Sequence, residues 1–130
     1  MKVLRTVLYL SAAAHVTGGL ALLLAPGAAM SALDQAQPDL AWIRLVGIQG
    51  TMTGLMQVII GHRVETLWWF SWTFVFGAVA SMAVFAWHAI AGVPAGSAVW
   101  PWWALAAFGA AGVVTLLAGL ALAGLERPAE

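Results

Sequence analysis

Four long apolar stretches, separated by short segments rich in proline, glycine and charge, constrain this sequence more than any other feature. A bilayer core about 30 Å thick takes about 20 apolar residues of helix to cross. The stretches at about residues 3–25, 40–61, 66–90 and 102–125 all reach that length. Because lipid offers backbone groups no hydrogen-bond partners, such a stretch crosses as an α-helix. The sequence therefore predicts an all-α protein, a four-helix transmembrane bundle forming one membrane domain over residues 1–130.

The composition excludes several other classes of protein. Hydrophobic residues make up 63% of the chain and charged residues 8%, whereas soluble domains have about 45–50% and about 25%. A small domain buries only about 60–70% of its surface, so a soluble globule cannot hide this much apolar surface. The basic residues form no stripe, which argues against nucleic acid as a partner. The absence of cysteine excludes disulfides, thiol nucleophiles and iron–sulfur clusters.

Helix-breaking residues and charge predict the topology. Pro26 ends the first stretch, and residues 28–33 are expected to form a short helix on the membrane surface. Lysine and arginine precede the first span, lie between the second and third, and follow the fourth, while residues 26–38 and 91–101 have none. Positive residues stay on the cytoplasmic side, so both termini are expected in the cytoplasm. Scarce lysine with abundant alanine and glycine indicates a bacterial source, hence a bacterial cytoplasmic membrane.

The first stretch has an alternative interpretation as a secretory signal peptide, since Lys2 and Arg5 precede it. Its apolar run of about 20 residues exceeds the 7–15 of a signal peptide, so we expect a retained span. Tryptophans near both ends of the spans are typical of the two interfacial belts of a membrane protein.

Small residues on each span predict close helix packing. Gly47, Gly50 and Gly54 share one face of the second span, and small residues let helix backbones approach in lipid. The other spans offer Gly18 and Gly19, Gly77 and Ser81, and Gly109, Gly112 and Gly119. We therefore expect a tight bundle with little room for a channel.

Polar side chains inside the spans are the candidate functional residues, because they are costly to place in lipid. His15 lies near the middle of the first span, and Gln49, Thr53 and Gln57 share a face of the second. A structural role, cross-linking neighbouring helices, is the favoured interpretation for these residues.

Arg44, towards the outer end of the second span, has three interpretations. It extends its guanidinium to the interface, it forms an ion pair with Asp34 or Asp39, or it binds an anionic ligand. His88 lies at a similar depth, so these four side chains form the best candidate cluster. The full set of ligand-binding candidates is Arg44, His88, His15, Asp34, Asp39, Gln49 and Thr53.

Patterns for metal or cofactor binding are weak. No span has two histidines four residues apart, as zinc sites often do. His15 and His88 differ in depth by about 10–15 Å at helical rise, too far to share one metal. No metal and no cofactor is predicted. Ser11, four residues before His15, leaves a pigment macrocycle as a minor alternative, and a quinone as another.

The sequence resembles the small four-helix membrane proteins of the DoxX-like kind, including relatives of unknown function. The residues that carry the resemblance are 15–26 (HVTGGLALLLAP), 44–47 (RLVG), 54–55 (GL) and 62–63 (HR), and it covers nearly the whole chain. It implies a four-helix bundle and, for some members, association with quinone-linked redox complexes.

The leading hypothesis is a non-enzymatic accessory or structural subunit whose partners are other membrane helices or lipids. The alternative is a small intramembrane enzyme, or a quinone- or lipid-binding protein, with an outward-opening pocket around Arg44 and His88. Whether the protein is an enzyme stays open at this point.

Overall fold

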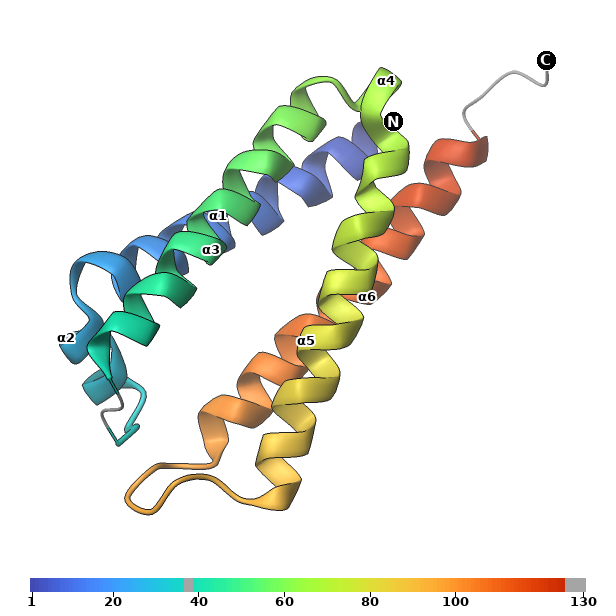
Figure 1. Ribbon diagram of the computed structural model, residues 1–130. Coiled ribbons are helices and arrows are strands. Elements are labelled where there is room, and N and C mark those ends of the chain that lie inside the picture. Colours follow the sequence, from blue (N-terminus) through green and yellow to red (C-terminus); the bar gives the residue numbers. More distant parts are fainter. Residues whose placement is uncertain (37–38, 126–130) are drawn as a thin grey trace.

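The computed structural model describes residues 1–36 and 39–125, which are helical apart from short connections (Figure 1). Four segments are long and apolar enough to cross a membrane, and this confirms the prediction of an all-helical chain with four candidate spans. The elements are α1 (Lys2–Leu24), α2 (Pro26–Ala32), α3 (Leu40–His62), α4 (Val64–Leu67), the 3-10 turn η1 (Trp68–Phe70), α5 (Ser71–Ala91) and α6 (Trp100–Leu125).

The short helix α2 was expected at residues 28–33 and begins two residues earlier, at Pro26. Proline fits the first turn of a helix because the amide that it lacks would have no partner there. The third span is also longer than predicted, since α4, η1 and α5 run on from Val64 to Ala91.

The four spans pack as two hairpins (Figure 1). Helix α1 lies along α3, and α5 lies along α6, while α1 also contacts α6. Helices α3 and α5 scarcely contact each other. The hairpins converge at the end that holds α4 and the N-terminus, here called the α4 end, and diverge towards the end that holds α2, the α2 end.

Glycine brings α1 and α3 together. A Cβ atom on Gly47 would lie 2.6 Å from the carbonyl oxygen of Gly19, and one on Gly54 would lie 2.8 Å from that of Ala12. Gly50 packs less closely, since its Cβ would lie 3.4 Å from Gly19 Cα. Helices in lipid associate through such close backbone contacts, so this hairpin is tightly packed.

The hairpins are joined at the α4 end by a hydrophobic core. Leu4 and Leu8 of α1 are fully buried there against residues from every other span, namely Ile60, Val64, Val75, Leu116, Leu120 and Ala123. Arg5 adds a polar clamp, because its Nε donates to the carbonyl of Gly61 over 3.1 Å and its guanidinium pairs with Glu65.

The bundle differs from the evenly tight one that we expected. A Cβ on Gly18 or Gly77 would meet no atom within 4 Å, and one on Gly112 would make only an ordinary contact. Gly109 and Gly119 do lie close to neighbouring helices. The small residues of α1, α5 and α6 are thus only partly used in contacts between these helices.

Candidate functional site

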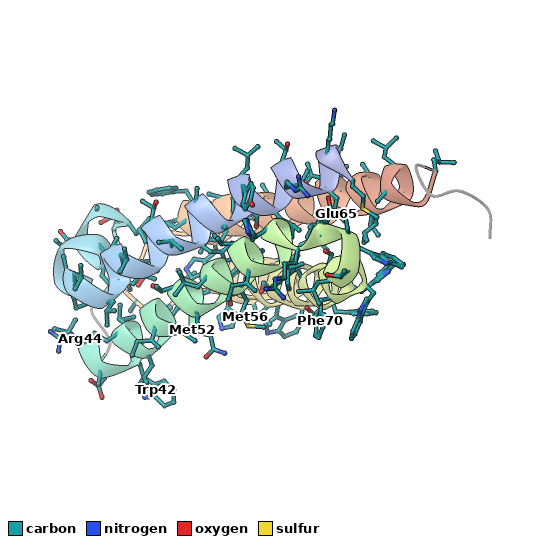
Figure 2. All side chains as sticks on the ribbon, turned by 90° about the horizontal axis from the view of Figure 1, so that it is seen from above. Trp42, Arg44, Met52, Met56, Glu65 and Phe70 are labelled. Carbon is teal, nitrogen blue, oxygen red and sulfur yellow. The ribbon has the colours of Figure 1, made fainter. Side chains whose placement is uncertain are left out.

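Arg44 lies exposed on the first part of α3. It makes no hydrogen bond and no ion pair with the residues that the structure describes, and Figure 2 shows its side chain pointing away from the helices. The ion pair with Asp34 or Asp39 is therefore not formed. This geometry matches a guanidinium that extends to the interface or one that faces an external anion.

The two acidic candidates have local roles in the backbone near α3. The carboxylate of Asp39 accepts a hydrogen bond from the amide of Ala41 over 2.9 Å, which caps the start of α3. Asp34 takes a left-handed backbone conformation with a φ of 53°. Its carbonyl accepts from the amide of Ala98 over 2.8 Å, while its side chain is exposed.

His88 belongs to a different group of residues from Arg44. Its Nδ1 donates to the carbonyl of Val84 over 2.9 Å, and its ring stacks on Trp102 with centroids 4.8 Å apart and planes at 14°. The indole Nε1 of Trp102 donates to Gln35 Oε1 over 3.1 Å. The sequence cluster of Arg44, His88, Asp34 and Asp39 is thus divided, with no hydrogen bond or ring contact between Arg44 and His88.

Gln35 connects the two hairpins at the α2 end. Its Nε2 donates to the carbonyl of Ala98 over 2.8 Å, and nearby the amide of Ala36 donates to Ser97 Oγ over 2.9 Å. We call these contacts, with the bond from Trp102, the α2-end tie. Gln35 could not be predicted from the sequence, because the pairing of two distant loops leaves no local pattern.

His15 is half-buried at the middle of α1 and turns towards α6, with its ring 6.1 Å from that of Phe108. Its Nδ1 lies 2.8 Å from the carbonyl oxygen of Ser11. The hydroxyl oxygen of Ser11 lies 3.3 Å from the same nitrogen. Because the shorter contact is with a carbonyl, which only accepts hydrogen bonds, we assign the proton to Nδ1, and this leaves the lone pair of a neutral imidazole on Nε2. This Nε2 has no hydrogen-bond partner among the described residues.

Polar residues on one face of α3 differ in whether their side chains have a hydrogen-bond partner. Thr53 Oγ1 donates to the carbonyl of Gln49 over 2.9 Å, which satisfies the hydroxyl within its own helix. Gln57 is only 2% exposed, and its buried Oε1 has no partner. Ser71, at the start of α5, is fully buried with an unpaired Oγ.

Contacts between the helices place three polar residues at one depth. Phe108 lies beside His15, and its neighbour Gly109 packs against Met82, which is adjacent to Ser81. Gly54 packs against Ala12 and Val16, so Thr53 also lies near the depth of His15. His15, Thr53 and Ser81 therefore lie at a similar depth along the spans.

A separate apolar groove of about 350 Å³ lies between α5 and α6. Five of its seven lining residues are alanines, and the other two are Met82 and Trp103. The lining residues are Met82, Ala83, Ala86, Trp103, Ala106, Ala107 and Ala110. No group of three or more metal-ligating side chains occurs in residues 1–36 and 39–125.

Comparison of the chain with protein-family models, with curated proteins and with solved structures found no match. The resemblance to the DoxX-like proteins therefore stays a prediction.

Proposed function

We propose that this protein is a non-enzymatic accessory subunit that binds a helix of another protein within a bacterial cytoplasmic membrane. Lys2, Arg5 and Arg63 lie at the α4 end, and residues 91–101 at the other end have no lysine or arginine. By the bias of positive residues to the cytoplasm, the α4 end and both termini are cytoplasmic. The connections between spans are short, so contacts with partners are made inside the bilayer.

The α5–α6 groove is the observation that carries this proposal. Many exposed positions of the spans outside the groove have large apolar side chains, as at Leu10, Phe76 and Val114, which are 68%, 70% and 67% exposed. The groove has alanine instead. Large apolar side chains suit contact with lipid, whereas small ones let another helix approach closely. The groove is therefore suited to a transmembrane helix.

The position of the groove leaves it free for a partner. Phe108 and Gly119 turn towards α1. At 100° per residue, Ala107 and Ala110 point about 100–180° away from these two residues around α6. A helix bound there would not displace α1. It would approach the pair α5–α6 from the lipid.

Photo-crosslinking in native membranes tests the proposal. A photoreactive amino acid at Ala107 is expected to give an adduct with a distinct membrane protein, while the same amino acid at Leu10 gives lipid adducts alone. Ala107→Trp fills the groove and is expected to remove the partner from the detergent-purified protein, whereas Leu10→Trp retains it. Lipid adducts alone at Ala107 in membranes of the native host would contradict the assignment.

A further inference from the structure

Polar side chains near the middle of the spans face the region between the two hairpins. His15 turns to Phe108 of the other hairpin, and Gln57 is buried one turn from Ile60 of the shared core. Thr53 lies one turn before Gln57 on the same side of α3. Ser81 lies on α5 between Phe74, which packs against the core, and His88, which stacks on Trp102.

Open space lies one turn along the helix from His15 and from Ser81. A Cβ on Gly18, one turn beyond His15, would meet nothing within 4 Å, and the same holds for Gly77, one turn before Ser81. Ser81 is exposed although it lies near mid-span. Polar residues of membrane spans face the protein interior or a bound group. These residues therefore point to a molecule that is not part of the chain.

The contacts around the region decide which kind of molecule fits. The hydrophobic core closes the α4 end, and the α2-end tie crosses the other end. Contact between α1 and α6 closes the back, whereas α3 and α5 scarcely touch. A helix that crosses the whole bilayer would meet both closed ends. A small molecule can enter sideways from the lipid, between α3 and α5.

Two hydrogen-bond acceptors in this region lack partners. Nε2 of His15 has a lone pair because Nδ1 donates to Ser11, and the buried Oε1 of Gln57 also lacks a donor. The surrounding side chains, such as Phe108, are apolar. We infer that an uncharged, lipid-soluble phenol or alcohol binds between the hairpins, where its hydroxyl donates a hydrogen bond to His15 Nε2.

Two matched probes test this site, namely 4-decylphenol and its methyl ether 4-decylanisole, which has the same apolar body without a donor. In the reconstituted protein, 4-decylphenol is expected to shift the ¹⁵N resonance of His15 Nε2, while the ether leaves it unchanged. The phenol is also expected to bind at least about tenfold more tightly than the ether, as one buried hydrogen bond allows. Equal affinities, or no shift at His15, would overturn the inference.

Variants distinguish the contribution of the hydrogen bond to probe binding from that of the open space beside His15. His15→Leu is expected to remove the preference for the phenol, whereas His88→Leu, at the stacked histidine, keeps it. Gly18→Leu places its Cβ in open space and is expected to abolish binding of both probes without lowering the thermal unfolding temperature. Undiminished binding to Gly18→Leu would place the probes elsewhere and refute the site.

This inference goes beyond the proposed subunit function and does not rest on it. The α5–α6 groove and the region between the hairpins lie on different sides of α6. Crosslinking of a partner at Ala107 is therefore expected to survive His15→Leu, so failure of one proposal can be distinguished from failure of the other.

Discussion

The glycines between α1 and α3 allow a sharp test of how this protein is held together. A Cβ on Gly47 would lie 2.6 Å from the carbonyl oxygen of Gly19 and 2.6 Å from the amide nitrogen of Leu23. Ordinary contact begins near 3.4 Å, so the substitution Gly47→Ala is short of space by about 0.8 Å. Both obstructing atoms belong to the backbone, and no side-chain rotation can relieve the clash. The two helices must move apart along their interface.

The size of the effect follows from two opposing terms. Overpacking in a well-packed interface costs about 1–3 kcal/mol, while replacing glycine by alanine inside a helix gains about 0.5–1 kcal/mol. Gly18→Ala is the matched control, because its Cβ meets nothing and only the second term applies. The free energy of unfolding of Gly47→Ala is therefore expected to fall below that of Gly18→Ala by about 1–3 kcal/mol.

The assay is reversible unfolding of the two variants in mixed micelles with increasing SDS, followed by circular dichroism and tryptophan fluorescence. If Gly47→Ala and Gly18→Ala unfold with the same free energy, the close approach of α1 and α3 is not what stabilises this hairpin. Gly54→Ala, blocked by the carbonyl of Ala12 at 2.8 Å, serves as an independent repeat of the test.

Three further predictions concern the polar contacts. Gln35→Ala removes side-chain bonds of the α2-end tie, so the amide of Ala98 is expected to exchange its hydrogen at least about tenfold faster, as loss of about 1.4 kcal/mol implies. Arg5→Leu removes a donor to Gly61 and the partly exposed ion pair with Glu65, and the free energy of unfolding is expected to fall by about 0.5–1.5 kcal/mol. Arg44→Leu is expected to leave the unfolding temperature unchanged, since Arg44 has no partner in the described residues.

Each of these predictions has a control or an outcome that would contradict it. Gln49→Ala, at an exposed glutamine, is expected to leave the exchange of Ala98 unchanged. Lys2→Leu is the control for Arg5→Leu, and equal unfolding of the two variants would show that the clamp at the α4 end adds nothing. A lower unfolding temperature for Arg44→Leu would mean that the guanidinium stabilises the fold.

The sequence predicted the four spans well because the length and polarity of a spanning helix are dictated by the bilayer. It also placed glycines on the face of α3 that packs against α1, since helix periodicity is regular. It did not predict that α3 and α5 would scarcely touch. A glycine permits close contact between helices, but Gly18 and Gly77 show that its presence does not determine whether another helix packs against it.

The candidate site was harder to predict for a physical reason. Depth along a span can be read from residue number, and that made Arg44 and His88 look like neighbours. Rotation about the helix axis and the pairing of helices cannot be read in the same way. The structure turns Arg44 outwards and stacks His88 on Trp102, and the contact between Gln35 and Trp102 depends on two loops meeting.

Cysteine accessibility measures the topology on which the whole account depends. The chain has no cysteine of its own, so single cysteines can replace Lys2, Arg63 and Ala95 in otherwise unchanged protein. With a membrane-impermeant maleimide, Ala95→Cys is expected to react in intact cells, and Lys2→Cys and Arg63→Cys only after the membrane is opened. Reaction of Lys2→Cys and Arg63→Cys from opposite sides of the membrane would contradict the four-span arrangement.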